Sequence, residues 1–417
     1  MLAVHAAARA VTAVLLLVVA ERQAENLWTP ASPSYPQYTG LMWDASWYRT
    51  IAEQGYPAEL PLGEDGRVQQ NAWAFFPLYP ALVRLVTVLT GQPWQVAAPT
   101  LSLVLGAAAM LAVHRAVSLG LASPALPVPG RVVPGGAAGS GGGARLPEGV
   151  RRHVPLVTVA VLTTGAAAPV LQVAYTESLA LLLLACALWC VMRRRYLLAV
   201  PVVLALGLTR AVALPLTVAV LAHGWARWRE QRGAGPGGAG PGGAWAPGEP
   251  LRLGVLAAAA GLSGVLWPAV VALATGRADA YPATQAAWRG TGDVVPLVPW
   301  VQVGQWLLGP WAVPALVVVA LGLVALLLSP PLARLGAALH GWTAGYLAYL
   351  VLVLEPGTSL VRFGLLAFPV AGVVAQLCLR ARWPRSAVAV VVLLGLLAQL
   401  LWLDELWRLV PPSGWPP

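Results

Sequence analysis

The stretches LALLLLACALWCV at residues 179–191 and AVAVVVLLGLLAQLLWL at residues 387–403 decide the class of this protein. Each is an apolar run, and an α-helix of about 20 such residues can cross the roughly 30 Å hydrocarbon core of a bilayer. The whole 417-residue chain agrees, because 58% of its residues are hydrophobic and only 10% are charged. A soluble domain carries about 25% charged residues. The sequence therefore predicts an all-α, polytopic integral membrane protein and excludes a soluble domain.

The positive charge is dispersed along the chain. The 26 basic side chains are all arginines, and they lie mostly between the apolar runs. This dispersal does not favour nucleic acid as a partner. The 5 histidines are scattered and form no metal-ligand set, so we expect no cofactor and no metal site built from histidines. Because cytoplasmic loops of membrane proteins are enriched in arginine, the charges instead predict which loops lie inside the cell.

Together, the apolar runs and the charges predict about eleven transmembrane helices with the N-terminus inside. Single crossings are expected at 2–20, 94–117, 251–274, 311–329, 335–354, 362–380 and 386–403. Segments 118–153 and 227–250 are rich in Gly and Pro and carry arginines, so we predict flexible cytoplasmic loops there. We expect residues 1–417 to form a single membrane domain.

Two further segments must each cross the membrane twice to keep both of their arginine-flanked ends inside. Segment 153–192 is too long for one crossing and has Pro169 near its middle, which predicts a hairpin. The run 196–226 is too long for one helix and short for two full spans. It is expected to be a pair of short helices that meet near Thr209–Arg210, as broken helices do where they line a cavity.

Residues 21–93 would form the first extracytoplasmic loop, and we expect two interfacial helices in it. The apolar piece FFPLYPALVRLVTVL at 75–89 would reach only about 22 Å as a helix at 1.5 Å per residue. It is therefore predicted to lie along the membrane interface rather than across the bilayer. A second surface helix is predicted over 42–57.

The 42–57 helix carries the first candidate site residue. Trp43, Trp47 and Ile51 recur at four-residue spacing and would give one apolar face that can lie on the membrane surface. Asp44 and Tyr48 share the neighbouring face. Asp44 has two readings: it begins a helix whose dipole favours a carboxylate there, or it takes part in chemistry.

Charged side chains at membrane depth usually mark function. Applied to the predicted outer face, this criterion leaves few other candidate site residues. Glu177 lies at the predicted tip of the hairpin, where it either starts a helix or orients a basic partner. Arg210 lies at the predicted helix break, and Arg362 begins a span, where it either snorkels to the interface or binds a ligand. Gln285 and Arg289 fall in an outer loop, where exposure explains them as well as binding does. Arginines bind phosphate through two parallel hydrogen bonds, so this set suits a phosphate-bearing polar headgroup.

Four ordered motifs add a family resemblance. They are WDASWYRTIAEQGY (43–56), NAWAFFPLYPAL (71–82), GAAAPVLQVAYTESLALLL (165–183) and ALGLTRAVAL (205–214). In their residues and order they resemble the PIG-V family of mannosyltransferases, which belongs to the GT-C superfamily of membrane glycosyltransferases. The resemblance covers the first half of the chain, and in the second half it extends to hydropathy and to the short stretches ATQAAWRG and RFGLLAFP.

The resemblance implies a GT-C fold and an inverting transfer of mannose from polyprenyl-phosphate-mannose to a glycolipid or envelope glycan. Asp44 would be the general base, Arg210 and Arg362 would bind the donor phosphate, and Glu177 would orient a substrate or partner. The remaining expected substrate-binding residues are Trp43, Tyr48, Trp73, Gln285, Trp288 and Arg289. The partners would be membrane lipids, the lipid-linked donor and the acceptor.

The expected location is a bacterial plasma membrane with the active site on its outer face, because the Lys-free, Gly- and Pro-rich composition is typical of a GC-rich bacterium. A transporter or flippase for a lipid-linked sugar remains the alternative. It would also use broken helices and charge within the membrane. It would not need an outer loop of aromatic surface helices, and the sequence shows no internal repeat of the kind that transporters have.

Overall fold

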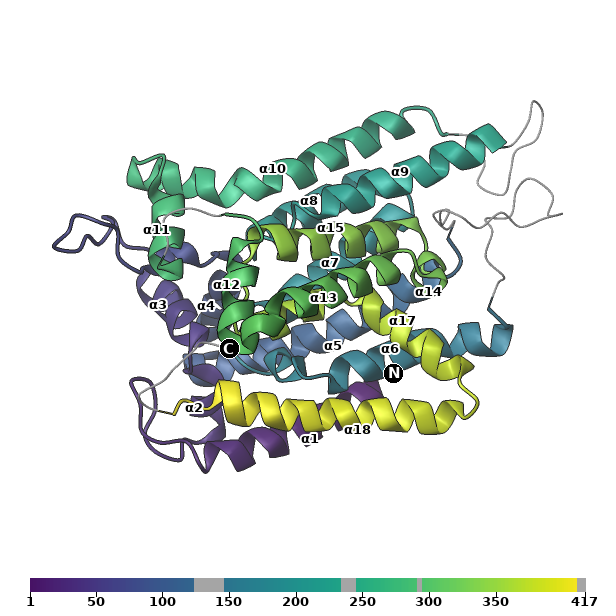
Figure 1. Ribbon diagram of the computed structural model, residues 1–417. Coiled ribbons are helices and arrows are strands. Elements are labelled where there is room, and N and C mark those ends of the chain that lie inside the picture. Colours follow the sequence, from purple (N-terminus) through teal and green to yellow (C-terminus); the bar gives the residue numbers. More distant parts are fainter. Residues whose placement is uncertain (124–145, 234–244, 291–294, 411–417) are drawn as a thin grey trace.

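The computed structural model describes residues 1–123, 146–233, 245–290 and 295–410. Within these ranges the regular structure is helical, and the one β feature is an isolated bridge between Leu62 and Val68. The long helices lie side by side in a single bundle (Figure 1). The prediction of an all-helical protein is thus confirmed for the described part of the chain.

The helices of the first half are α1 (Leu2–Ala20), α2 (Tyr35–Gly40), α3 (Asp44–Gln54), α4 (Leu78–Thr90), α5 (Trp94–Gly120), α6 (Glu148–Thr164), α7 (Glu177–Met192), α8 (Tyr196–Gly207) and α9 (Leu216–Gly233). Those of the second half are α10 (Glu249–Thr275), α11 (Ala280–Arg289), α12 (Val298–Leu308), α13 (Ala312–Leu327), α14 (Pro330–Ala333), α15 (Ala337–Val353), α16 (Leu360–Phe363), α17 (Pro369–Arg380) and α18 (Pro384–Trp402). Short turns lie at η1 (Ala72–Ala74), η2 (Ala168–Leu171), η3 (Gly309–Trp311), η4 (Gly364–Leu366) and η5 (Leu403–Trp407).

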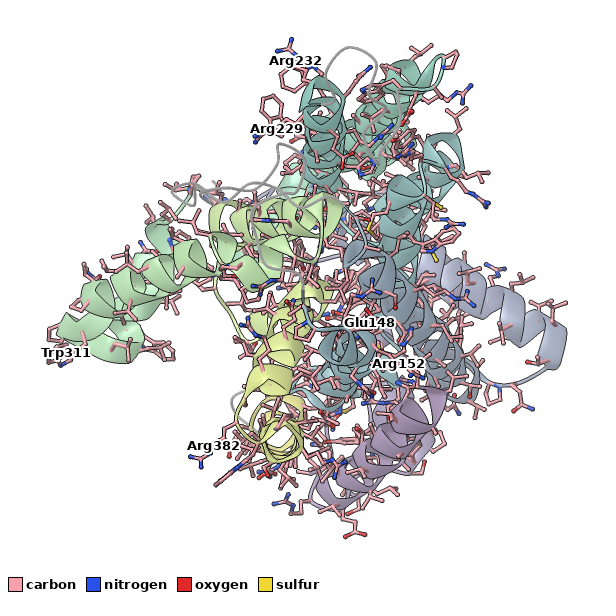
Figure 2. All side chains as sticks on the ribbon, turned by 90° about the vertical axis from the view of Figure 1, so that its right-hand side faces the viewer. Glu148, Arg152, Arg229, Arg232, Trp311 and Arg382 are labelled. Atoms are coloured by element: carbon pink, nitrogen blue, oxygen red, sulfur yellow. The ribbon has the colours of Figure 1, made fainter. Side chains whose placement is uncertain are left out.

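Among the described residues, five helical stretches are long and apolar enough to cross a membrane. They are α1, α5, α10, Val298–Leu327 and Pro384–Trp407. The stretch Val298–Leu327 turns back at Gly309. The turn is evident from the contact of Gly304 in α12 with Ala312 and Leu316 in α13. Its two halves form an arm that projects from the bundle, with Trp311 at the tip (Figure 2). Helices α4, α7, α8 and α15 are apolar but shorter.

Both predicted helix interruptions are present. Segment 153–192 is divided into α6 and α7 by an irregular stretch that includes η2. Segment 196–226 is divided into α8 and α9, and Thr209–Arg210 falls in the gap between them. These interruptions matter because each brings a polar side chain from the end of a helix into the interior of the bundle.

Two boundary predictions are wrong. The expected single span at 362–380 is broken, because α16–η4 and α17 meet at 77°. Pro369 begins α17, and a proline disfavours helix in the residue before it and donates no backbone hydrogen bond. The expected loops 118–153 and 227–250 are shorter than predicted, since α5, α6, α9 and α10 extend into them. Their Gly-rich parts, 124–145 and 234–244, lie outside the described residues.

The first loop, 21–93, contains more helix than the expected pair, namely α2, α3, η1 and α4. Helices α3, α4 and α11 gather at one end of the bundle, on the left in Figure 1. The predicted apolar face of Trp43, Trp47 and Ile51 points into the protein instead of lying on a membrane surface. Trp43 and Ile51 are buried, and Trp47 stacks on Phe75 with ring centroids 5.8 Å apart.

Close packing of α18 on α6 fixes the end of α6 just before its interruption. A methyl group added at Gly395 would lie 2.6 Å from the backbone oxygen of Thr164. We expect Gly395→Ala to lower the free energy of unfolding by about 1–3 kcal/mol, as overpacking does. Gly322→Ala in α13 is the matched control, because nothing lies within 4 Å of that position. Thermal unfolding in detergent measures both, and equal midpoints would contradict the expectation.

Candidate functional site

A buried cluster of four charged side chains forms where α3, α7, α16 and the gap between α8 and α9 meet. Arg362 is at its centre. Its Nη2 lies 2.8 Å from Oδ2 of Asp44, and its Nη1 lies 3.1 Å from Oε1 of Glu177. The same Glu177 oxygen accepts a hydrogen bond of 2.6 Å from Nη1 of Arg210. Residues from distant parts of the sequence, which the motifs had singled out separately, are thus in direct contact.

Asp44 occupies the first position of α3, so its carboxylate lies where the helix dipole favours negative charge. Trp43 precedes it with a φ of 59°, a left-handed conformation that bulky residues rarely adopt. The Trp43 indole N–H donates to the backbone oxygen of Trp407 at 2.7 Å. This turn directs Trp43 toward η5 and Asp44 toward Arg362. Asp44 therefore fits both of its predicted readings, a helix start and a member of a charged cluster.

Glu177 begins α7 and its side chain is only 1% exposed. The preceding Thr176 occupies the N-cap position, but its side chain makes no capping hydrogen bond. Its hydroxyl instead accepts a hydrogen bond of 3.0 Å from Nη1 of Arg210. Thr176 and Glu177 together hold Arg210 in the gap between α8 and α9, so Arg210 is oriented by two acceptors.

Aromatic rings enclose the two guanidinium groups. The Arg362 guanidinium carbon lies 5.0 Å from the ring centres of Tyr175 and Phe363, and that of Arg210 lies 4.6 Å from the Phe363 ring. Arg362 is 6% exposed, which excludes the alternative that it snorkels to the interface. Desolvated cation–π contacts of this kind contribute about 2 kcal/mol. They keep both guanidinium planes in fixed orientations.

Two atoms of the cluster lack a partner among the described residues. Oε2 of Glu177 and Nε of Arg362 are both buried and make no hydrogen bond there. A buried polar atom without a partner costs roughly 1–3 kcal/mol. One acceptor and one donor are therefore available to a ligand that enters the cluster.

Tyr48 lies one turn beyond Asp44 on α3, and it is buried against Phe75 and Tyr79 at centroid distances of 5.3 and 5.6 Å. Burial, with the nearby Asp44 carboxylate, raises the pKa of the Tyr48 phenol above its ordinary value. The side chain thus stays a neutral hydroxyl. Tyr48 therefore lies beside the charged cluster, and its predicted role in substrate binding stays a prediction.

Other predicted substrate-binding residues lie outside the cluster. Trp73 stacks on Tyr56 at 4.4 Å and donates its indole N–H to the backbone oxygen of Pro57. Gln285 donates to the backbone oxygen of Ala74 at 3.4 Å. Arg289 pairs with Glu355 rather than with the cluster, since its Nε lies 3.9 Å from Oε1 of Glu355.

Trp288 shares this arrangement, since its indole N–H donates to the backbone oxygen of Asn71 at 3.3 Å. Helix α11 packs against η1, and its side chains satisfy backbone carbonyls of the first loop that would otherwise be buried unpaired. These side chains therefore lie outside the charged cluster, and their role in substrate binding stays a prediction. Their link to the cluster is indirect, through a row of rings in which Trp288 and Tyr48 each lie 5.3 Å from Phe75.

Sequence reasoning missed Tyr175 and Phe363 as the rings around the arginines, and it missed Thr176 as a hydrogen-bond partner of Arg210. Thr176 and Phe363 are the immediate neighbours of Glu177 and Arg362, and Tyr175 lies two residues before Glu177. Adjacency to a charged residue at a helix interruption was the available signal. The side on which these rings lie could not be read from the sequence, because it depends on where the breaks before α7 and around α16 place the backbone.

In the described part of the chain, no group of three or more His, Cys, Asp and Glu residues is arranged to hold a metal ion. The cluster contains two carboxylates and two guanidinium groups, so its formal charges balance. An anionic group can bind the arginines here by replacing a carboxylate. Comparison with protein-family models, curated proteins and solved structures gives no match, so the assignment of a function depends on this geometry and on the motifs.

Proposed function

We propose that this protein is a GT-C-type, inverting mannosyltransferase that uses polyprenyl-phosphate-mannose and works on the outer face of a bacterial plasma membrane. The observation that carries the proposal is the contact of Asp44 with Arg362, and of Arg362 and Arg210 with Glu177. It joins a carboxylate that can act as a base to two cations that can hold a phosphate. The short helices of the first loop and the motifs of the PIG-V family support it.

In this mechanism the donor phosphate competes with Asp44 for Arg362. As the phosphate oxygens take the guanidinium group, the Asp44 carboxylate is released toward the acceptor hydroxyl. Asp44 Oδ2 then accepts the hydroxyl proton while the acceptor oxygen bonds to the anomeric carbon. The bond from that carbon to the phosphate oxygen breaks, and polyprenyl phosphate leaves with the electron pair. Arg362 and Arg210 stabilise the negative charge that grows on the leaving phosphate.

Glu177 holds the two arginines at a fixed separation throughout. Its shared Oε1 keeps Arg210 in place when Arg362 turns from Asp44 to the phosphate. The acceptor is proposed to be a glycolipid or a cell-envelope glycan, since its hydroxyl must reach Asp44 at the end of the bundle where the first loop gathers. About eleven crossings with this end outside complete the proposed topology.

The reaction is tested with purified protein reconstituted in liposomes. Labelled mannose should pass from polyprenyl-phosphate-mannose to an acceptor lipid, and GDP-mannose should not replace the donor, because nucleotide sugars are made in the cytosol. Donor flipping without a new glycosidic bond would support the transporter reading instead. Equal activity with GDP-mannose would contradict both the outer site and the GT-C assignment.

If Arg210 binds the donor phosphate, its replacement by alanine should weaken donor use more than its replacement by lysine. Arg210→Ala should weaken donor use by about 1.5–3 kcal/mol, the contribution of a hydrogen bond to a charged group, and affect acceptor binding much less. Arg210→Lys should restore only part of the loss, because an ammonium group cannot reproduce the forked geometry. The KM for each substrate measures this. Arg277→Ala is the control, since Arg277 is an exposed arginine paired with Asp279, and an equal effect of both variants would refute the role.

A further inference from the structure

The turn between α7 and α8, at the far end of α7 from Glu177, carries three consecutive arginines, Arg193, Arg194 and Arg195. At about 1.5 Å per residue, the 16 residues of α7 separate this turn from the charged cluster by roughly 24 Å. All three arginines are exposed. The turn is therefore distinct from the site proposed for catalysis.

Backbone geometry gathers two of these side chains at one place. Arg194 adopts a φ of 58°, the left-handed conformation that closes a helix and that glycine usually supplies. Its N–H donates to the oxygen of Val191, and the N–H of Arg195 donates to that of Cys190. The guanidinium carbons of Arg193 and Arg195 lie 5.7 and 5.8 Å from the centre of the Trp189 ring.

Within the described residues, no carboxylate forms an ion pair with Arg193 or Arg195. The α7 dipole favours basic residues at this end, but it does not require an indole beneath them. On the adjoining first turn of α8, Leu197 and Leu198 are 53% and 59% exposed. The turn thus combines two uncompensated cations, an amphipathic indole and apolar side chains.

Other arginines surround this end of the molecule. Arg194 interacts electrostatically with Glu230 of α9. Figure 2 looks onto the end where α9 finishes and shows Arg152, Arg229, Arg232 and Arg382 spread around it. Arg232 lies 4.1 Å from the ring of Trp228, and Arg382 lies 5.5 Å from that of Trp383. The pairing of arginine with tryptophan recurs here, but the α7–α8 turn places two cations on one ring.

We infer that this turn binds the headgroup of an anionic phospholipid. Arg193 and Arg195 would hold the phosphate, and Leu197 and Leu198 would contact the acyl chains. The exposed leucines favour a phospholipid over a free phosphate, because on an apolar helix of the bundle they place acyl chains directly beside the two arginines. Juxtamembrane arginines attract anionic lipid by about 1 kcal/mol each, which is about a fivefold change in affinity.

The test compares lipid retention by the full-length protein in detergent, measured by native mass spectrometry with added phosphatidylglycerol or phosphatidylcholine. The double variant Arg193→Gln/Arg195→Gln should lose about 25-fold in affinity for phosphatidylglycerol, at about fivefold per arginine, and none for phosphatidylcholine. Both side chains are exposed, so the thermal unfolding midpoint in phosphatidylcholine should stay unchanged. Glycerol phosphate at the same concentration should not displace the lipid.

Two control variants distinguish a specific lipid-binding site from nonspecific attraction of anionic lipid to positive charge. Arg194→Gly removes one charge but keeps the left-handed turn, since glycine adopts it at no steric cost, and it should lose no more than the roughly fivefold affinity of one arginine. Arg382→Gln removes another arginine at the same end and should do likewise. The inference is overturned if either control loses as much as the double variant, if the two lipids bind equally well, or if glycerol phosphate competes.

Discussion

Asp44→Asn should abolish mannosyl transfer while the protein stays folded and inserted. The amide has the shape of the carboxylate but cannot accept the proton of the acceptor hydroxyl. Loss of a general base typically lowers the rate about 10²–10⁴-fold. The measurement is single-turnover transfer by the purified variant in liposomes, with donor at saturation so that weaker binding does not contribute.

Glu53→Gln is the matched control for this variant. Glu53 lies on the same helix, but it forms an exposed pair with Arg49 at 2.8 Å and lies apart from the cluster. Its activity should equal that of the unchanged protein. Near-normal turnover by Asp44→Asn would show that Asp44 is not the base, even if Arg210 proved to bind the donor.

Hydropathy predicted the all-helical character of the described residues because it reports the one property that membrane helices share. Long apolar runs became helices, and the arginine-flanked segments 153–192 and 196–226 were broken where charge and length required it. The interruption around α16 escaped prediction, because 362–380 has the hydropathy of a single span. Its 77° bend depends on Pro369 and on the packing around it.

The site was predictable to the extent that polar residues fell at helix interruptions. Asp44, Glu177 and Arg210 each stand at the end of a helix or in a gap, and a gap in an apolar bundle must satisfy its polar groups internally. The pairing of Asp44 with Glu177 through Arg362 could not be inferred, because it joins residues of the first half to one far along the chain. Trp288 and Gln285 lie outside this cluster, and their side chains donate hydrogen bonds to loop backbone.

Arg362→Gln should be the most destabilising change in the cluster. It removes the cation that lies between two carboxylates. Glu177 would then keep only Arg210 as a partner, and Asp44 would lose its ion-pair partner. Breaking a buried ion pair from one side costs about 3–5 kcal/mol, because a charge is left uncompensated. Thermal or denaturant unfolding in detergent should show this loss, together with an absence of transfer.

The double variant Arg362→Gln/Asp44→Asn separates charge balance from function. With Asp44 neutral, Glu177 and Arg210 remain as an ion pair, so much of the lost stability should return. Transfer should not return, because the donor phosphate would still lack one of its two proposed guanidinium ligands. Arg22→Gln, which removes an arginine paired with Asp404 and 50% exposed, should change stability by about 1 kcal/mol or less. If Arg362→Gln unfolded at the same midpoint as the unchanged protein, Arg362 would not be the cation that holds the two carboxylates together.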